Sequence, residues 1–364
     1  MIDIICIVAA ENIEQMSFSN NARSFLMLEA GRKVPAQSIS THVGGGACNT
    51  AVALARRGWQ SAVLARVGRD HNAGAVRAHL AANGVAADRL AEATDAATGT
   101  AVMVASHDRN ASIFVHRGAN EGISEPDLAP AAFEGRDLVH IAPLSSRSAD
   151  AFGLIARRAR AAGARVSANP GIRHLTSRTG AFLEALADID LLSVNRVEAE
   201  ALVPALAARL GEAPDPVPAD GAPALLRRGL TGGGFSLGLQ RFLHGLRGLG
   251  PRHVLLTDGT EGAWLAAPRE SQGPGAAPAS PDTALLWCPT LPATVAGTAG
   301  AGDSFTSTLT AALAEGAAPE RAMLEAAANA ASVVSVVDTT EGLLTRAALE
   351  ARVATLGEIA FFRA

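Results

Sequence analysis

The sequence predicts an α/β fold built around a mostly parallel sheet, and three observations support this. Apolar runs of strand length, such as 2–8 and 189–194, are rich in β-branched residues, as buried parallel strands are. Longer helical patterns alternate with these runs, which is typical of βαβ units. The alternation breaks at 98–117, where two strand-like runs flank a polar turn in the pattern of an antiparallel hairpin. We therefore expect a small β lid, or an edge extension, beside the ligand-binding crevice.

The composition is that of an ordinary soluble globular protein. The 364 residues are 48% hydrophobic and 18% charged, which suffices for one large core with or without a small appendage. The formal net charge is -4 and the sequence has no basic run. The charge therefore gives no indication of binding to nucleic acid or to an acidic membrane. No apolar run reaches membrane-spanning length, and the first ten residues lack the basic flank of a signal peptide. We expect a cytoplasmic protein with neither nucleic acid nor membrane as partner.

The sequence contains three cysteines, and their spacing does not suggest a paired motif. Cys6, Cys48 and Cys288 make an odd number, and none of them belongs to a CxxC motif. This argues against a disulfide framework or a zinc site and for a reducing compartment. All three are expected in the core.

The remaining elements follow from short apolar runs, helical periodicity and stop signals. Helix 50–57 ends at Gly58 and helix 72–82 at Asn83-Gly84, which are natural helix terminators. The expected strands are 2–8, 24–29, 37–43, 61–67, 100–105, 112–116, 138–141, 164–168, 189–194, 253–257 and 263–267. The expected helices are 50–57, 72–82, 148–161, 179–186, 236–246 and one that opens at the 300–303 turn and runs to 314.

Two segments are expected to be irregular surface insertions. The segment 204–223 is rich in Ala, Pro, Gly and Asp without usable periodicity, and 271–283 is rich in Pro, Gly and Ser. The run Thr231 to Gly234 has neither a strand before it nor a GKT or GKS after it, so we expect a turn there and no phosphate loop.

Polar residues follow the first strand directly. Glu11, Asn12 and Glu14 come just past its carboxyl end, which is where side chains line the ligand crevice of open α/β sheets. They are therefore candidates to hydrogen-bond a polar substrate, and a solvated turn is the alternative.

A glycine run precedes the helix at 50–57. Gly44, Gly45 and Gly46, followed by Ala47, Cys48 and Asn49, place bare backbone and an amide side chain at a helix start. Such a loop can press its backbone against a hydroxylated ligand, although ordinary turns use glycine as well.

Polar side chains also follow two strands in the middle of the chain. Asn169 follows one strand, and Asn195 with Glu198 follows the next, at the spacing of one helical turn. Asn195 and Glu198 can therefore face the same point and hold a hydrated Mg²⁺ through water. The alternative is a helix cap, with Asn195 and Glu198 forming a capping box.

The most informative stretch is Gly297 to Phe305. Small residues stand directly before Asp303, where a helical pattern begins, so backbone N–H groups are bare at a helix N-terminus. We expect a phosphate to approach these amides closely because Gly300 and Gly302 have no side chain, with the Asp303 carboxylate beside it. A phosphate cradle with an adjacent base indicates phosphoryl transfer. The alternative is a glycine turn with Asp303 as a helix cap.

These motifs together resemble those of the ribokinase-like carbohydrate kinases, the PfkB family. Gly44 to Ala51, with Gly58 and Gly68 at their spacings, is similar to the N-terminal signature, and Gly300 to Phe305 is similar to the C-terminal one. Further resemblances are Thr98-Gly99, Gly118-Ala119-Asn120, the NxxE motif of Asn195 and Glu198, Thr257-Asp258-Gly259, and Asn329. The resemblance covers nearly the whole chain. It implies one three-layer α/β/α kinase domain over 1–364, with lid strands from about 12–43 and 98–120.

The resemblance also implies a role for each matching residue. Asp303 would be the general base that takes the proton of the acceptor hydroxyl, and the amides of Gly300, Ala301 and Gly302 would be the anion hole for the γ-phosphoryl group. Glu198 would order Mg²⁺ through water. The nucleotide-binding residues would be Asn195, Thr257, Gly259 and Asn329, and the substrate-binding residues would be Asn12, Glu14, Gly45, Gly46, Asn49 and Asn169. The lid would exclude water, and its strands would pack against a second copy in a homodimer.

The chain also departs from the family pattern. The family usually has Asp where this chain has Gly297, a position that in many members helps bind a monovalent cation, so potassium dependence does not carry over. Glu14 and Asn169 stand where Asp is more usual, and 142–145 lacks the Glu that ribokinases proper have there. The acceptor is therefore a sugar or a related alcohol of unspecified hydroxyl pattern.

The hypothesis is an ATP- and Mg²⁺-dependent kinase that phosphorylates a sugar-like alcohol. A nucleoside kinase of the same family and a catalytically silent sugar- or nucleotide-binding regulator are the alternatives. An intact Asp303 argues against the silent binder, because binding alone requires no base. A nicotinamide oxidoreductase would need GxGxxG after the first strand, and 9–14 contains no glycine.

Overall fold

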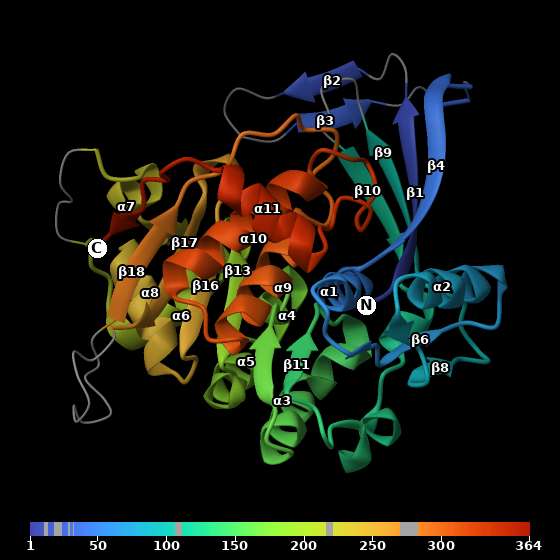
Figure 1. Ribbon diagram of the computed structural model, residues 1–364, viewed down its shortest axis with the longest axis horizontal. Coiled ribbons are helices and arrows are strands. Elements are labelled where there is room, and N and C mark those ends of the chain that lie inside the picture. Colours follow the sequence, from blue (N-terminus) through green and yellow to red (C-terminus); the bar gives the residue numbers. More distant parts are fainter. Residues whose placement is uncertain are drawn as a thin grey trace.

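The computed structural model describes residues 1–10, 14–17, 24–27, 30–31, 33–105, 111–215, 221–269 and 283–364. Helices cover both faces of a seven-stranded sheet, and a second, four-stranded sheet projects from one end of this body (Figure 1). Within the described parts of the chain, no helix combines the length and apolar character needed to cross a bilayer.

The seven-stranded sheet is parallel in one part and antiparallel in the other. Its order is β11-β12-β13-β16-β17-β18-β19; neighbours are parallel from β11 to β16 and antiparallel from β16 to β19. The strands are β11 (Leu138–Ile141), β12 (Arg165–Ala168), β13 (Leu191–Asn195), β16 (His253–Thr257), β17 (Ala263–Pro268), β18 (Thr283–Cys288) and β19 (Phe362–Arg363). The expected strands of this region are confirmed within two residues, while β18 and β19 were not expected.

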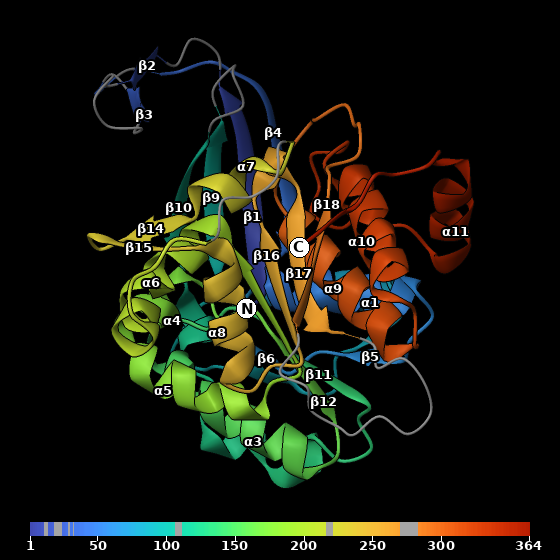
Figure 2. The ribbon, with the colours of Figure 1, turned by 90° about the vertical axis from the view of Figure 1, so that its left-hand side faces the viewer.

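The sheet is buried on both faces because its side chains alternate between two cores. In β16, Val254 and Leu256 belong to one hydrophobic cluster and Leu255 to the other. One face is covered by α3 (Phe152–Ala161), α4 (Ile172–Ser177), α5 (Thr179–Ala185), α6 (Arg196–Leu210), α7 (Ala224–Arg228) and α8 (Leu239–Gly248). The other carries α1 (Gly46–Arg56), α9 (Ala301–Ala314), α10 (Pro319–Val333) and α11 (Arg346–Thr355), as Figure 2 shows. The expected three-layer α/β/α arrangement is confirmed.

The first strand lies outside the seven-stranded sheet. The four-stranded sheet has the order β10-β9-β1-β4, in which β1 pairs with β9 in parallel and with β4 in antiparallel fashion. Its strands are β1 (Asp3–Ala10), β4 (Ala36–Gly44), β9 (Thr100–Ala105) and β10 (Ala111–His116), and β2 (Glu14–Ser17) pairs with β3 (Ser24–Met27) in a separate ribbon. The apolar run at 2–8 predicted a strand correctly, but an apolar run does not specify its neighbours. The hairpin at 98–117 is confirmed as β9 and β10.

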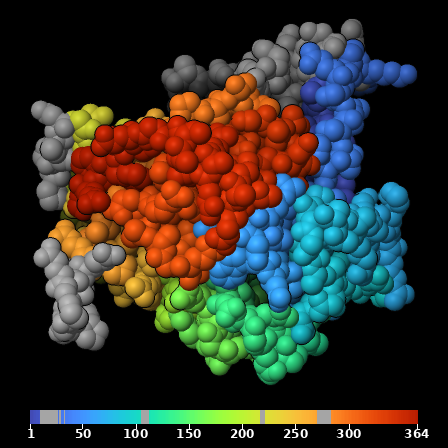
Figure 3. Space-filling view, viewed as in Figure 1, coloured from blue at the N-terminus to red at the C-terminus, as the bar shows by residue number. Residues whose placement is uncertain are grey.

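A smaller group of elements, cyan in the space-filling view, adjoins α1 (Figure 3). The predicted strand 61–67 is two short pieces, β5 (Ser61–Ala62) and β6 (Ala65–Val67), which pair with β7 (Val85–Ala86) and β8 (Leu90–Glu92). Helix α2 (His71–Ala82) packs beside them, with Asp70 as its N-cap. These elements share a core with α1 in which Cys48 is fully buried.

The first predicted insertion is partly wrong, because α6 continues through Pro204 to Leu210. Leu206, within the segment that looked irregular, is only 1% exposed. Pro204 has no N–H, so the Glu200 carbonyl loses its helical donor. The hairpin of β14 (Leu230–Gly232) and β15 (Phe235–Leu237) covers this point, with Gly232 directly against the Glu200 carbonyl. The turn expected at Thr231 to Gly234 is therefore the tip of a hairpin.

Of the second predicted insertion, 271–282 lies outside the described residues, and Thr283 already begins β18.

All three cysteines are free thiols, and Cys48 and Cys288 are buried as expected. Cys6 is only partly buried, because it lies on β1 in the projecting sheet.

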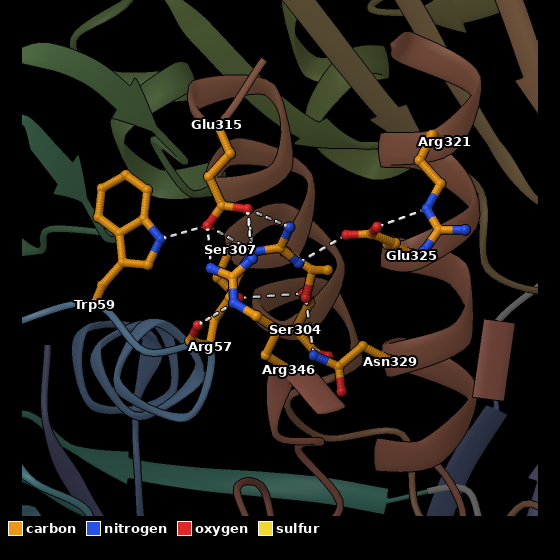
Figure 4. A network of polar contacts seen from close by, with 10 residues as sticks. Arg57, Trp59, Ser304, Ser307, Glu315, Arg321, Glu325, Asn329 and Arg346 are labelled. Atoms are coloured by element: carbon orange, nitrogen blue, oxygen red, sulfur yellow. Dashed lines mark hydrogen bonds and ion pairs between the residues drawn. The ribbon is translucent and has the colours of Figure 1, made fainter. Parts of the chain in front are cut away.

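A network of ion pairs ties α1 to the three C-terminal helices (Figure 4). Arg57, which caps the C-terminus of α1, is 7% exposed and donates to Glu315, after α9, and to Glu325 of α10 at 2.8 Å. Glu315 also accepts from Trp59 at 2.7 Å and from Arg346 of α11 at 2.6 Å. Partial burial opposes ionisation of Glu315, but the donors from Arg57, Arg346 and Trp59 lower its pKa to about 2.

We expect Glu315→Gln to lower the free energy of unfolding by on the order of 3 kcal/mol at neutral pH, because it leaves the buried Arg57 with half of its partners. The folded pKa of Glu315 lies below its ordinary value of 4.5, so its contribution is complete above that pH and is lost as the pH falls towards 2. Urea unfolding of both proteins between neutral and acidic pH measures this difference. Glu350→Gln, at an exposed carboxylate of α11, is the control, and an unchanged difference at low pH would contradict the assignment.

Candidate active site

Two glycine turns from opposite ends of the sequence meet where α1 and α9 begin. Gly45 precedes α1 with φ +90°, and Gly300 precedes α9 with φ +83°, conformations that glycine adopts without strain. One turn into each helix, Nδ2 of Asn49 donates to Oδ2 of Asp303 at 2.7 Å. The Oδ1 atom of Asp303 lies beside Gly46, 3.4 Å from where a Cβ would stand. The structure thus brings Gly46, Asn49 and Asp303 together, as the two signatures suggested.

The N-terminus of α9 leaves backbone donors available next to Asp303. The first helical hydrogen bond runs from the Ser304 N–H to the Gly300 carbonyl at 2.8 Å, so the N–H groups of Gly302 and Asp303 have no helical acceptor. Ala301 donates to the Thr298 carbonyl at 3.3 Å, a long bond. Nothing lies within 4 Å of where a Gly302 side chain would be, and Gly302 is exposed. An anion therefore has open access to these amides.

Gly300 contributes to this turn in a different way from that expected. A Cβ there would lie 2.7 Å from the Thr339 carbonyl oxygen, so the missing side chain makes room for Thr339 and not for a ligand. Gly302 is the glycine that opens the approach. The sequence motif did not distinguish the two roles.

The Asp303 carboxylate is held in an environment that makes it a stronger base than an exposed Asp. Burial raises its pKa, and the hydrogen bond from Asn49 opposes that rise only in part. Oδ1 of Asn49 is itself buried and has no hydrogen-bond partner among the described residues. A buried acceptor of this kind costs about 1–3 kcal/mol unless a donor reaches it, and a hydroxyl group is a suitable donor.

A second polar cluster lies at the carboxyl ends of β12 and β13. Asn195 and Glu198 form a reciprocal capping box: each backbone N–H donates to the other side chain, both at 2.9 Å. The amide of Asn169 donates to the Ser193 carbonyl at 3.1 Å and to Oε2 of Glu198 at 3.4 Å. The structure therefore directs the Asn169 amide at Glu198. The capping-box interpretation is confirmed, and it fixes the Glu198 carboxylate in place.

The negative charge of Asp303 influences the pKa of Glu198. Glu198 is 6% exposed; burial raises its pKa, hydrogen bonds from Asn195 and Asn169 lower it, and the Asp303 charge raises it further. Two acids that repel each other across a site favour a cation near them. In the described part of the chain, no three His, Cys, Asp or Glu side chains are grouped so as to hold a metal.

The turn after β16 is held by two arginines that the sequence did not single out. Asp258, 9% exposed, pairs with Arg196 at 2.7 Å and with Arg228 at 2.8 Å. The neighbouring Gly259 has φ +54° and open space where a side chain would be, and Thr257 is half-buried at the end of the strand. The only sequence signal for Arg196 was its place directly after Asn195.

The prediction for Asn329 as a nucleotide contact is not supported. Asn329 is 3% exposed on α10; its Nδ2 donates to the Thr308 hydroxyl at 2.8 Å, and its Oδ1 accepts from the Leu344 N–H at 2.9 Å. Both ends of the amide are thus used inside the protein: the bond to Thr308 ties α10 to α9 (Figure 4), and the bond from Leu344 ties α10 to the segment before α11. Asn12 lies outside the described residues, and Glu14 is described only as part of strand β2.

The comparisons with known proteins match the chain to carbohydrate kinases. The family model of the pfkB family carbohydrate kinases matches residues 5–221 and 237–346. The chain is 41% identical to a ribokinase of Bacillus subtilis over 96 residues, and 30% identical to an ATP-dependent ribose-1-phosphate kinase of Halopiger xanaduensis over 175 residues. These matches cover 26% and 48% of this chain, and 32% and 57% of the two relatives, so the chain matches less than two thirds of either one.

The fold is shared more widely than the sequence. A structure of Arabidopsis thaliana ribokinase complexed with ribose and ATP superposes with a TM-score of 0.68 at 21% identity, over 98% of this chain and 97% of that one. This likeness shows that the chain has the same overall fold as that ribokinase. Since the family model matches most of the described residues and both signatures, the chain belongs to the pfkB family of carbohydrate kinases.

Proposed function

We propose that this protein transfers the γ-phosphoryl group of ATP to a hydroxyl group of a sugar or sugar-like alcohol. The observation that carries the proposal is the position of Asp303. Its side chain is partly buried, oriented by Asn49, and adjacent to the bare amides at the start of α9. A base and an anion site within one helical turn are what in-line phosphoryl transfer requires, since the reaction needs positioning and charge neutralisation more than covalent help.

In the proposed reaction, Asp303 accepts the proton of the acceptor hydroxyl while the hydroxyl oxygen bonds to the γ-phosphorus. The bond from that phosphorus to the β,γ-bridging oxygen breaks, and ADP leaves. The raised pKa makes Asp303 a better proton acceptor than an exposed Asp, and Asn49 keeps one carboxylate oxygen fixed. The amides of Gly302 and Asp303 would hold the phosphoryl oxygens, and Ala301 would join them by giving up its long bond to Thr298.

The nucleotide and its metal would occupy the carboxyl ends of β13 and β16. Glu198, held by its capping box, would bind Mg²⁺ through water, and the bound ion would neutralise charge on the phosphates. Asn195 would lie along ATP at the end of β13, and Thr257 and Gly259 would do so at the end of β16 and in the turn that Arg196 and Arg228 fix through Asp258. The alcohol would lie on the other side of Asp303, against Gly46 and Asn49. Gly45 stays a candidate from the resemblance alone, because a Cβ there would lie 2.6 Å from the Met1 carbonyl oxygen. Asn12, Glu14 and Asn169 stay candidates for that pocket from the resemblance alone.

We expect ADP release with Mg-ATP on one class within a panel of pentoses, hexoses, ketoses, sugar acids, sugar phosphates and nucleosides. Ribose and ribose 1-phosphate belong in the panel because two relatives are named for them. Asp303→Asn should lower kcat at least about 100-fold, because the amide cannot accept the proton. Unchanged thermal denaturation of the variant is the control for folding. Ligand-dependent thermal shifts without turnover in either protein would favour the silent binder instead.

We expect Glu198→Gln to raise the concentration of free Mg²⁺ needed for half-maximal activity, while the capping box is retained because the glutamine oxygen still accepts from Asn195. Titrating activity with Mg²⁺ measures the change. Glu184→Gln, at an exposed position of α5, controls for the loss of one negative charge. Identical Mg²⁺ curves for wild type and Glu198→Gln would remove Glu198 from the proposed metal site.

We also propose that the four-stranded sheet is a lid whose outer face pairs with a second copy of the chain. Ile39 and Phe114 are 67% and 59% exposed, and the strand register places both on one face with Val8, Val102 and Val104. His42 lies on the opposite face, where it contacts the body. An exposed apolar stripe on a sheet is typical of a covered interface.

We expect Phe114→Asp to shift the protein from dimer to monomer, because a carboxylate would be buried without a partner in the paired lids. Sedimentation velocity at several protein concentrations measures the shift. Phe235→Asp, at the 41% exposed Phe of the β14–β15 hairpin, should leave the dimer intact. A wild type that is monomeric throughout would refute this mode of assembly.

A further inference from the structure

The loop between α10 and α11 is organised around the carboxylate of Asp338. Its Oδ1 accepts from the N–H groups of Thr340 and Glu341, at 2.6 and 2.7 Å, and from the Thr340 hydroxyl at 2.9 Å. Its Oδ2 lies 2.7 Å from Nδ1 of His42 on strand β4. Burial raises the pKa of Asp338, but these hydrogen bonds outweigh burial and lower it, so the carboxylate is ionised at neutral pH. One side chain thus holds both the loop and the lid strand.

The loop places Thr339 between two glycines that belong to the active site. Thr339 is 1% exposed. Its carbonyl oxygen would lie 2.7 Å from a Cβ on Gly300, and its hydroxyl oxygen 2.9 Å from a Cβ on Gly44. The hydroxyl also donates to the Val43 carbonyl at 3.4 Å. Neither glycine has room for a side chain, so Thr339 acts as a spacer of fixed thickness between them.

Each of these glycines leads directly to one partner of the Asn49 and Asp303 pair. Gly44 ends β4 and is followed by the turn into α1, which carries Asn49. Gly300 caps α9, which carries Asp303 and the bare amides. The separation of the two turns sets how the base faces the anion site. Because Asp338 fixes Thr339, it acts on the base and the amides without touching them.

The other contacts of the loop restrain it from the opposite side. Arg56 of α1 donates to the carbonyls of Thr340 and Leu343, at 2.6 and 2.7 Å. His79 of α2 lies 3.4 Å from the Thr340 hydroxyl, and Nε2 of His42 lies 2.8 Å from the Ser40 hydroxyl on β4. The lid strand β4 therefore meets an otherwise restrained loop through two neighbouring contacts, His42 with Asp338 and Val43 with Thr339.

We propose that Asp338 is a positioning residue for phosphoryl transfer: through Thr339 it sets the spacing of the turns at Gly44 and Gly300, and through His42 it couples the lid strand to that spacing. This role rests on the proposed kinase function. It requires that loss of the Asp338 contacts slow the chemical step more than it weakens ATP binding, since no hydrogen bond among the described residues joins the loop to the proposed nucleotide residues Asn195, Thr257 and Gly259.

The experiment compares kcat and KM for ATP in Asp338→Ala, Asp338→Asn and wild type, on the alcohol that the panel identifies. Asp338→Ala should lower kcat about 10- to 100-fold, with KM for ATP changed less than about threefold, because displacements near 1 Å at a reacting centre cost that much. Asp338→Asn keeps an oxygen for the three bonds within the loop and should recover most of kcat. It also serves as the folded variant if Asp338→Ala does not fold.

The matched control is Asp127→Ala. Asp127 likewise accepts from a backbone N–H and a hydroxyl, both of Ser124, and pairs with Arg66. It lies in the short 3-10 helix Glu125–Leu128, and no hydrogen bond among the described residues joins that helix to the turns at Gly44 and Gly300. The Asp127→Ala variant should lose stability comparable to that lost by Asp338→Ala and should keep the kcat of wild type. An equal loss of kcat in Asp127→Ala, or a kcat of Asp338→Ala within twofold of wild type, would overturn the positioning role.

A second readout does not depend on activity. The backbone amide resonances of Gly44 and Gly300 in the unliganded protein should move in Asp338→Ala, return towards wild type in Asp338→Asn, and stay unchanged in Asp127→Ala. Unmoved resonances would contradict the proposal even if wild type phosphorylates no compound of the panel. If these resonances move in Asp338→Ala but wild type phosphorylates no compound, the result would support the role of Thr339 as a spacer and contradict only the proposed kinase function.

Discussion

Helices α1 and α9 lie side by side and are tied to each other at both ends. At their N-termini Asn49 donates to Asp303, and at their C-termini Arg57 donates to Glu315. The two helices therefore run in the same direction, and both present the positive end of their dipole to the Asp303 carboxylate. This parallel pairing is unfavourable unless an anion sits where the positive ends converge. The carboxylate supplies one negative charge, and a phosphate group would supply more.

The position of α9 on the sheet depends on hydroxyl groups as much as on apolar packing. Thr306 bonds to Ser193 of β13 at 2.7 Å, and Thr310 bonds to Ser167 of β12 at 3.1 Å, all in the buried interior. Directional bonds of this kind fix the rotation and translation of a helix, which contacts between alanines do not. The helix that carries the base is thus set in register with the strands that carry Asn169 and Asn195.

The sequence revealed the parts of the site that depend on local chemistry. Glycine turns before helices, an acid in a first helical turn and the spacing of Asn195 and Glu198 are local patterns, and the structure brings those residues into two adjoining clusters. It could not reveal what depends on tertiary neighbours. Gly300 and Gly302 look alike in sequence, yet one makes room for Thr339 and the other opens to solvent. The resemblance implies a nucleotide contact for Asn329, whereas both ends of its amide bond to Thr308 and Leu344 inside the protein. Pro204 interrupted the helical pattern of α6, although a hairpin packed on the freed carbonyl lets the helix continue.

The capping box at the start of α6 has a consequence for how a metal would arrive. A free glutamate on a surface samples several rotamers, and binding an ion selects one of them at a cost in entropy. Glu198 has already lost that freedom during folding, because its carboxylate closes the N-terminus of α6. In the proposed metal site, the entropy of ordering the Glu198 side chain would therefore be lost when α6 folds and not when the ion binds. Affinity for the metal and stability of α6 are then linked, so that the ion, once bound, would protect the amides at the start of this helix from hydrogen exchange.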